Sequence, residues 1–257
     1  MDGDFAENHL IPALSAAALY GRGVFTTVSI VAGEPFLWQK HWRRLNANAG
    51  TVGMDVAGVV EPDVHDWLGK LINENHVDDG VARITFFDAR PTEMWPYAAA
   101  KRLSVLITTR HRRSIPERLG LTVSPYRVNS ASPLAGVKSC NYLENIIARE
   151  EVRSRGFDEG VRLNERGEVA GGTMSNIFWL KDGVLLTPPL STGCLPGTTR
   201  DYILEKLDCR ERVTEVDELK TADAVFLTSA GLGVVQVIRF DDITYATTSH
   251  PVLSALK

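Results

Sequence analysis

Four short runs that favour β-strands follow one another in the second half of the chain, with only turn residues between them. Between residues 160 and 188 these runs are GVRLN, RGEVAGG, MSNIFWL and DGVLLTP. Runs of this length, bounded by Gly, Asn and Asp, are typical of strands joined by tight turns. The pattern predicts a series of hairpin-connected strands in this part of the chain.

Other segments favour helices, so the chain as a whole is expected to be α+β. Apolar residues recur at helical spacing over residues 64–75 and 141–155, and a helix over residues 198–207 is predicted to begin directly after GCLPG. HWRRLNANAG is predicted to form one or two helical turns that end at Gly50. The other predicted strands are GVFTTVSIV, PFLWQ, VARITFF, RLSVLITT, LTVSPYRV and residues 224–228, the last followed by a glycine-containing loop.

A candidate linker divides the chain. The stretch TRHRRSIPERL, residues 109–119, is charged and contains proline. A chain of 257 residues is long enough for two domains of ordinary size. We therefore expect an N-terminal α+β domain over residues 1–112 and a C-terminal α+β domain over residues 113–257.

Composition excludes several classes of protein. The net charge of −4 gives no basic surface for nucleic acid, and no apolar run reaches membrane-spanning length. The acidic, polar start MDGDFAENHL does not resemble a signal peptide. Three cysteines without ligand-like spacing favour reduced thiols, and the scattered histidines predict no metal site. We expect a cytoplasmic protein without nucleic-acid, membrane or metal partners.

GCLPGTTR is a candidate phosphate-binding segment. A glycine-containing loop that leads into a helix leaves backbone N–H groups unpaired at the first helical turn. Gly197 permits close approach of a ligand, and Thr198 and Thr199 add hydroxyl groups. Such a helix start suits a phosphate. The alternative is an ordinary capped helix in which the two threonines only cap the first turn.

Lys138 and the arginine pair of KHWRRL are further candidates. Lys138 follows small apolar residues and precedes a predicted helix, where desolvation would lower its pKa and allow a Schiff base; the alternative is a surface lysine. Either Arg43 or Arg44 could bind a phosphate, or both could be solvated. Tyr20, in YGRGVFTT, could line a pocket or belong to the core. A phosphate site, an amine nucleophile and an arginine are the components of a pyridoxal phosphate enzyme.

The order of these motifs resembles the class IV aminotransferase family, whose members are fold type IV pyridoxal phosphate enzymes. Seven stretches match in the family's order over nearly the whole chain, which is far more specific than any single match. They are YGRGVFTT, HWRRL, GVKSCNYLENIIAREE, DEGVRLNERGEV, TMSNIFW, TPPLSTGCLPGTTR and ADAVFLTSAGLG. The resemblance implies two α+β domains of the D-amino acid aminotransferase-like fold, with pyridoxal 5'-phosphate at their interface, the Schiff-base lysine in the C-terminal domain, and a homodimer.

The resemblance also implies roles for individual residues. Lys138 matches the lysine that forms a Schiff base with the cofactor and moves a proton, and Arg44 matches the arginine that binds the cofactor phosphate. Gly197, Thr198 and Thr199 match a helix start that holds the same phosphate. Two further matches are Ser229 and Ala230, in a loop that approaches the phosphate or substrate, and a mainly structural asparagine corresponds to Asn176.

Within the family, GVFTT, AGVK, NIFW and FLTSAGLGVV look closer to aminodeoxychorismate lyases than to branched-chain aminotransferases, in which the position of Thr26 usually holds Glu. Thr26 and Tyr20 are therefore candidate substrate residues. The implied reaction splits 4-amino-4-deoxychorismate into 4-aminobenzoate and pyruvate, a step of folate biosynthesis, with Lys138 taking the ring proton. The alternatives are an amino-acid transaminase of D- or branched-chain type and a non-catalytic protein that binds the cofactor or a metabolite.

The chain departs from the family pattern at Gly171. In Val-x-Glu-x-x-x-x-Asn-x-Phe, Val169, Asn176 and Phe178 align, and Gly171 stands where the family has a glutamate that keeps the pyridine nitrogen of the cofactor protonated. Glu168 is not expected to replace it, because an odd offset along a strand reaches the opposite face unless a bulge re-aims the chain. The expected result is a retained cofactor site with a weaker electron sink. A lyase whose product becomes aromatic should tolerate this more readily than a transaminase.

Overall fold

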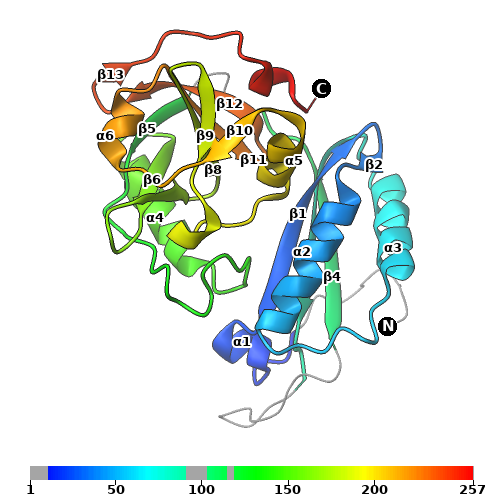
Figure 1. The fold of residues 1–257 in the computed structure, drawn as a ribbon. Coiled ribbons are helices and arrows are strands. Elements are labelled where there is room, and N and C mark those ends of the chain that lie inside the picture. Colours follow the sequence, from blue (N-terminus) through cyan, green and yellow to red (C-terminus); the bar gives the residue numbers. More distant parts are fainter. Residues whose placement is uncertain (1–10, 91–102, 115–118, 257) are drawn as a thin grey trace. The chain divides into compact units, whose positions relative to one another are not determined.

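The computed structural model describes residues 11–90, 103–114 and 119–256, which form two compact units (Figure 1). Unit 1 comprises Met1–Arg113 with Val137–Tyr142, and unit 2 comprises Ser114–Gly136 with Leu143–Lys257. Part of the expected linker, residues 115–118, lies outside the described residues. Lys138 was expected in the C-terminal domain, but it belongs to unit 1, because its segment pairs with a strand of that unit.

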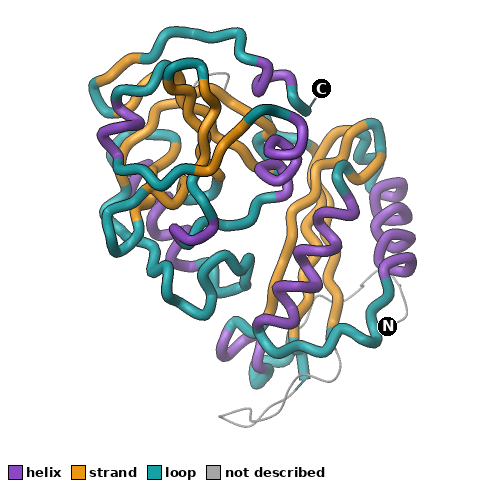
Figure 2. The backbone as a smooth tube through the Cα atoms, in the orientation of Figure 1, coloured by secondary structure: helices purple, strands orange, loops and turns teal. Residues whose placement is uncertain are grey.

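Unit 1 contains a four-stranded antiparallel sheet with two helices packed on one face. The strands lie in the order β2 (Glu34–Pro35), β1 (Gly23–Val31), β3 (Asp79–Phe87) and β4 (Ser104–His111). Val28 and Ile84, like other even-numbered residues of β1 and β3, pack with residues of α2 (Trp38–Thr51) and α3 (Glu61–Glu74). Successive strand residues point to opposite faces, so odd-numbered residues face away from these helices. Figure 2 shows the two helices running beside the strands.

The predicted strand PFLWQ is wrong. Only Glu34–Pro35 pair as β2, and α2 already begins at Trp38. Trp38, His41 and Leu45 are buried at helical spacing, so one side of this segment is covered by the sheet. This burial outweighs the strand preference of its aromatic residues. Gly50, expected to end the helix, lies inside α2. A short helix, α1 (Ala16–Tyr20), precedes β1.

Unit 2 is built on a nine-stranded mixed sheet. The strand order is β10 (Cys209–Glu211), β9 (Val184–Thr187), β8 (Asn176–Lys181), β11 (Ala224–Ser229), β12 (Gly233–Phe240), β5 (Leu119–Val123), β6 (Glu159–Leu163) and β7 (Val169–Gly172), with β13 (Ile243–Thr244) paired to β12. The predicted hairpins β6–β7 and β8–β9 are confirmed. The sequence interpretation missed β12, which occupies the expected terminal loop.

The sheet of unit 2 is apolar on both faces, so helices and turns pack against each of them. On β8, Ile177 and Trp179 belong to one core cluster, whereas Phe178 belongs to a second cluster with Ile203 of α5 (Thr198–Lys206). The remaining helices are α4 (Leu143–Ser154), α6 (Val216–Lys220) and the 3-10 turns η1 (Leu190–Thr192) and η2 (Pro251–Ser254). The expected α+β class is confirmed in both units. Over the described ranges, no helix is both long enough and apolar enough to span a membrane.

Candidate active site

Lys138 is held beside β1 by backbone pairing. The two-residue strand β2 pairs only with Ile30 and Val31, at the far end of β1. At the near end, Phe25 N donates to Lys138 O at 2.9 Å and Cys140 N donates to Gly23 O at 2.8 Å. The short β2 therefore leaves an edge of β1 that the lysine segment covers, and this fixes the backbone of Lys138.

The amine of Lys138 is half-buried among aromatic rings. Its Nζ donates to Tyr142 Oη at 3.3 Å and lies 4.4 Å from the centre of the Phe25 ring and 4.7 Å from that of Tyr142. Burial, followed by the positive charges of Arg44 and Arg83, lowers the pKa of Lys138 from 10.5 to about 7. A substantial fraction of the amine is therefore unprotonated near neutral pH, which is the form that attacks a carbonyl group.

Arg83 is a site residue that the sequence interpretation missed. It lies on β3, and its guanidinium stacks 3.6 Å from the centre of the Phe25 ring while Nε donates to Thr85 Oγ1 at 3.2 Å. The side chain is exposed, yet it is close enough to Lys138 to lower the pKa of that amine. The available signal was an arginine inside the otherwise apolar run VARITFF. Arg83 can offer a cationic donor to an anion that reaches Lys138.

Arg44 reaches β1 from α2. Its Nη2 donates to Thr26 Oγ1 at 2.8 Å, and His41 Nδ1 lies 2.7 Å from the same oxygen. Burial lowers the pKa of Arg44 to about 10, so the guanidinium remains charged at neutral pH. Its neighbour Arg43 is exposed and contacts Gln39 O at 3.4 Å. Of the two arginines, the structure brings Arg44 near Lys138.

Thr26 and Tyr20 were both predicted as substrate residues, and the structure places them differently. Thr26 has an exposed fraction of 0% and lies under α2, where its hydroxyl bonds to Arg44. The prediction for Thr26 is therefore corrected, because a buried hydroxyl engaged by a guanidinium does not face a ligand. Tyr20 is half-buried at the end of α1.

In unit 2, α5 begins with a glycine that packing requires. A Cβ on Gly197 would collide with Oδ1 of Asn176, whose Nδ2 donates to Leu195 O at 2.8 Å. Gly197 is the N-cap and makes no side-chain cap bond, and Thr198 and Thr199 are each 4% exposed. The first turn of α5 thus carries main-chain donors beside two buried hydroxyl residues, an arrangement that suits a phosphate.

Ser229 ends β11, Ala230 follows it, and both are half-buried. Leu232 N lies 3.1 Å from Ser229 Oγ and 3.2 Å from its carbonyl oxygen, which closes a turn there. The preceding residue, Thr228, pairs with Asn176 across the β11–β8 ladder and is fully buried. Its Oγ1 has no hydrogen-bond partner within the described part of the chain. A buried hydroxyl without a partner is costly, so this atom points to a bound group at this position.

Gly171 lies on the bulged strand of the β6–β7 hairpin. The register shifts so that Leu163 pairs with Val169 while Arg162 pairs with Gly171, which leaves Ala170 as the additional residue of the bulge. A Cβ on Gly171 would lie 3.2 Å from the carbonyl oxygen of Ser175. The residue directly opposite Gly171 is therefore an arginine, not a carboxylate.

Arg162 is buried and rigidly held, with an exposed fraction of 4%. Its Nε donates to Tyr126 O at 3.2 Å and its Nη2 donates to Arg127 O at 2.7 Å. The same Nη2 also pairs with the carboxylate of Glu144 at the start of α4. These contacts tie β6 to the segment after β5 and to α4, so the cation opposite Gly171 has a fixed position.

Glu159, which the sequence interpretation also missed, shapes the turn between Gly171 and Asn176. Its Oε1 accepts from the backbone N–H groups of Gly160 and Thr173, both at 2.9 Å, and from the Thr173 hydroxyl. Its Oε2 accepts from Met174 N at 3.2 Å and Ser175 Oγ at 3.3 Å. Both oxygens are therefore used inside the turn. The only signal was a glutamate at the start of an apolar strand run.

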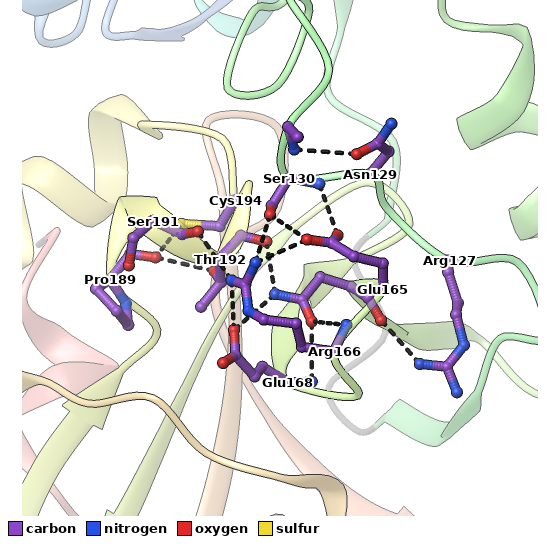
Figure 3. Close-up of polar contacts among 12 residues, drawn as sticks. Arg127, Asn129, Ser130, Glu165, Arg166, Glu168, Pro189, Ser191, Thr192 and Cys194 are labelled. Carbon is purple, nitrogen blue, oxygen red and sulfur yellow. Dashed lines mark hydrogen bonds and ion pairs between the residues drawn. The ribbon is translucent and has the colours of Figure 1, made fainter.

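Glu168 does not replace the carboxylate missing at Gly171. Figure 3 shows it at the turn between β6 and β7, where Arg166 lies between Glu165 and Glu168 at 2.7 and 2.6 Å. Arg166 also donates to Ser130 Oγ at 2.9 Å and to Ser191 O at 3.2 Å. Arg166 thus connects this turn to the loop at Ser130 and to Ser191 before α5. The Glu168 carboxylate is already occupied by its ion pair with Arg166.

An amine that is partly neutral near pH 7, with cations close by, can react with an aldehyde that carries an anionic group. The site therefore has the chemistry that an enzyme needs to react with a carbonyl compound carrying an anionic group. The family model for class IV aminotransferases matches residues 23–240, and the chain belongs to this family.

Individual relatives agree with this assignment. The chain is 30% identical over 248 residues to the aminodeoxychorismate lyase of Bacillus subtilis (strain 168), which covers 93% of this chain and 84% of that protein. It is 28% identical over 232 residues to the D-alanine aminotransferase of Staphylococcus aureus (strain MSSA476), covering 87% and 81%. The crystal structure of the 4-amino-4-deoxychorismate lyase from Pseudomonas aeruginosa matches with a TM-score of 0.84 at 26% identity, covering 99% and 95%. The expected fold type IV architecture is confirmed, and the chain is an enzyme of a family that includes lyases and aminotransferases.

Proposed function

We propose that the protein is a pyridoxal phosphate-dependent lyase that splits 4-amino-4-deoxychorismate into 4-aminobenzoate and pyruvate. The observation that carries the proposal is the amine of Lys138, whose pKa of about 7 suits both covalent attachment to an aldehyde and proton transfer at neutral pH. The likeness to two lyases of this activity supports the choice of substrate.

The residues present fit this cofactor. Lys138 offers a partly neutral amine for its aldehyde, and Arg44 offers a half-buried guanidinium for its phosphate. In unit 2, the first turn of α5 suits a polar ligand, and so does the buried hydroxyl of Thr228, which has no hydrogen-bond partner among the described residues. When bound, pyridoxal phosphate supplies the aldehyde that the lysine attacks and a ring that withdraws electrons from the substrate.

The amine of Lys138 performs the proton transfers in the proposed reaction. It takes a proton from a ring carbon of the substrate, and the electrons left behind expel the pyruvyl ether oxygen as the ring becomes aromatic. The released enolpyruvate takes up a proton and becomes pyruvate, so no oxidant or reductant is needed. Tyr142 Oη, 3.3 Å from Nζ, orients the amine, and Arg83 is placed to bind a substrate carboxylate.

Gly171 favours the lyase over a transaminase. A transaminase depends more strongly on a cofactor ring that withdraws electrons, and Gly171 offers no carboxylate that would keep the ring nitrogen protonated. Aromatisation of the product lowers the demand for such stabilisation. The altered environment of Gly171 is therefore compatible with the lyase reaction and unfavourable for amino-group transfer.

The test is to supply the protein with pyridoxal phosphate and 4-amino-4-deoxychorismate and to measure both products. We expect equal amounts of 4-aminobenzoate and pyruvate, and no products with Lys138→Ala. Lys70→Ala is the matched control, because Lys70 is an exposed lysine of α3 that pairs with Asp66 of the same helix. Amino-group transfer from an amino acid to a keto acid, without pyruvate release from the chorismate derivative, would contradict the proposal.

A transaminase acting on D-amino or branched-chain amino acids is the second candidate. It is favoured by the similarity to the D-alanine aminotransferase of Staphylococcus aureus. The two candidates differ in the fate of the substrate nitrogen, which stays on 4-aminobenzoate in the lyase reaction and moves to the keto acid in a transaminase. A protein that binds the cofactor without turnover of either substrate would leave only the non-catalytic alternative.

We also propose that the protein acts as a homodimer. The outer face of α4 exposes Leu143, Ile146 and Ile147, with exposed fractions of 65%, 41% and 43%. An apolar helix face of this kind is typical of a protein–protein contact. Sedimentation equilibrium tests the proposal: a mass near twice that of the chain is expected, and Ile146→Glu should lower it toward that of a monomer.

A further inference from the structure

The hydroxyl of Thr26 lies between two side chains of α2. Arg44 Nη2 donates to Thr26 Oγ1 at 2.8 Å, and His41 Nδ1 lies 2.7 Å from the same oxygen. His41 and Arg44 are three residues apart on the helix, so both side chains point toward β1. Thr26 and His41 are 0% and 2% exposed, so neither offers a surface to a ligand.

The chemistry of these groups fixes the direction of the Arg44–Thr26 hydrogen bond, and the tautomer of His41 sets the direction of the other. A guanidinium only donates, so Arg44 uses a lone pair of the Thr26 oxygen. The hydroxyl proton is then available for His41, whose Nδ1 accepts it when the ring is neutral. Burial, followed by the charges of Arg44 and Lys138, lowers the pKa of His41 to about 3, so the ring is neutral at physiological pH. In the tautomer whose Nδ1 is unprotonated, Arg44 donates to Thr26 and Thr26 donates to His41.

We propose that Thr26 and His41 form a positioning pair that holds the guanidinium of Arg44 in the orientation that binds the phosphate of the cofactor. The inference rests on the proposed function, because that function supplies the phosphate. Neither residue of the pair touches the ligand; both act through Arg44. This assigns Thr26 a role different from substrate contact and gives a function to a buried histidine that the reaction itself does not use.

A neutral hydroxyl suits this task. A long arginine side chain loses considerable rotamer freedom when it is fixed, and holding it before the ligand arrives removes that cost from binding. Thr26 accepts the hydrogen bond without placing a negative charge beside the arginine. The guanidinium is therefore oriented by a group that does not itself repel an incoming phosphate.

The experiment compares two ligands that differ only in the phosphate. Dissociation constants are measured for pyridoxal phosphate and for pyridoxal with the wild-type protein and with Thr26→Val and Thr26→Ser. Valine keeps the shape of threonine without the hydroxyl, and serine keeps the hydroxyl. We expect Thr26→Val to weaken binding of pyridoxal phosphate by about tenfold, the size of a lost hydrogen bond to a charged group. Binding of pyridoxal should stay unchanged, and Thr26→Ser should keep the wild-type preference for the phosphorylated ligand.

His41 supplies an independent arm. Asparagine can place an acceptor near the position of Nδ1, whereas leucine cannot. His41→Asn should therefore keep the preference for pyridoxal phosphate, and His41→Leu should reduce it. Combining Thr26→Val with Arg44→Ala should add nothing to the effect of Arg44→Ala alone, because the pair acts only through that arginine.

Several results would overturn the inference. One is that Thr26→Val weakens the binding of pyridoxal phosphate and of pyridoxal equally. A second is that Thr26→Ser loses the preference for pyridoxal phosphate. A third is that the effects of Thr26→Val and Arg44→Ala add in the double variant. If Thr26→Val does not fold, the serine and His41 variants decide. A wild-type protein that binds pyridoxal phosphate no more tightly than pyridoxal overturns the cofactor assignment as well, whereas normal wild-type preference with no effect of the variants overturns the positioning pair alone.

Discussion

Gly171 and Arg162 face each other across the β6–β7 ladder, so a position without a side chain lies beside a buried, rigidly held cation. The bulge at Ala170 creates this pairing, since a regular ladder would have placed a different residue opposite Arg162. The position at which the family carries a glutamate therefore has no carboxylate, and the residue across the ladder is an arginine that is paired with Glu144.

Restoring a carboxylate at position 171 should change the spectrum of bound pyridoxal phosphate. We expect Gly171→Glu to shift its visible absorbance toward the protonated ring and to raise amino-group transfer relative to lyase activity. Because a Cβ at 171 comes within 3.2 Å of the Ser175 carbonyl oxygen, the variant should also lose about 1–2 kcal/mol of stability. Gly171→Ala carries the same Cβ without the charge. Identical spectra for the two variants would contradict the alignment of this position.

The pKa of Lys138 predicts how attachment of an aldehyde depends on pH. The rate of imine formation with pyridoxal phosphate should rise as the pH passes through about 7, because the pKa of this amine is lowered to that value. The measurement is the rate of borohydride-trapped adduct at Lys138, located by mass spectrometry, between pH 5 and pH 9. A rate that rises only near pH 10, as for an ordinary lysine, would show that the amine is not desolvated.

The same lowered pKa links Lys138 to stability. Below pH 7 the amine is charged in both folded and unfolded chains, and its burial as a cation is unfavourable. Between pH 7 and pH 10.5 the unfolded chain binds more protons, so stability rises with pH over this window. Lys138→Met should therefore raise the Tm of the protein without cofactor, and the gain should shrink as the pH rises from 7 to 10. A gain independent of pH would argue against this origin.

Gly197 and Gly50 form a matched pair of glycines at which alanine should have opposite effects. A Cβ at Gly197 collides with Oδ1 of Asn176, so Gly197→Ala should lower the free energy of unfolding by about 1–3 kcal/mol and weaken phosphate binding at α5. Nothing lies within 4 Å of a Cβ at Gly50, which is inside α2, so Gly50→Ala should raise it by about 0.5–1 kcal/mol. Urea unfolding checks both. Equal effects would mean that the packing of Asn176 against Gly197 is wrong.

Glu159 should be a strong determinant of the turn between Gly171 and Asn176. Glu159→Gln replaces an acceptor with an NH2 group that faces N–H donors, so it should lower the free energy of unfolding by about 2–3 kcal/mol. Glu165→Gln is the comparison, because Glu165 also accepts several hydrogen bonds but is exposed. Its loss should be smaller. A larger effect of Glu165→Gln would contradict the importance assigned to burial.

The sequence predicted those parts of the fold that local patterns determine. The hairpins β6–β7 and β8–β9 follow from short β-branched runs with glycine turns, and both were found. The strand predicted for PFLWQ is wrong because a helix lets Trp38, His41 and Leu45 bury their side chains on one face. This burial stabilises the helix more than the local strand preference stabilises a strand. Strand β12 was overlooked because glycines precede it; Gly233, with φ of +70°, starts the strand directly after a turn.

The candidate site was only partly predictable. The spacing of His41 and Arg44 on one helix face was visible in HWRRL, but the contact of both with Thr26 depends on the packing of α2 against β1. Lys138 could be named, whereas its aromatic surroundings could not, because Phe25 is more than a hundred residues away in the chain. Contacts between distant segments leave no periodic signal in a single sequence.

The brevity of β2 has a consequence for the assembly of the protein. Val137–Tyr142 cover the edge of β1 that β2 leaves uncovered. During synthesis, unit 1 therefore cannot fold completely until Tyr142 has left the ribosome, by which point β5, the first strand of unit 2, has already been made. A fragment ending at Arg113 would lack a strand-like piece of its own sheet, and a separate peptide spanning residues 137–142 would be its complement. Lys138 thus lies on a segment that could be supplied as a separate peptide, which makes the chain a candidate for reconstitution from fragments.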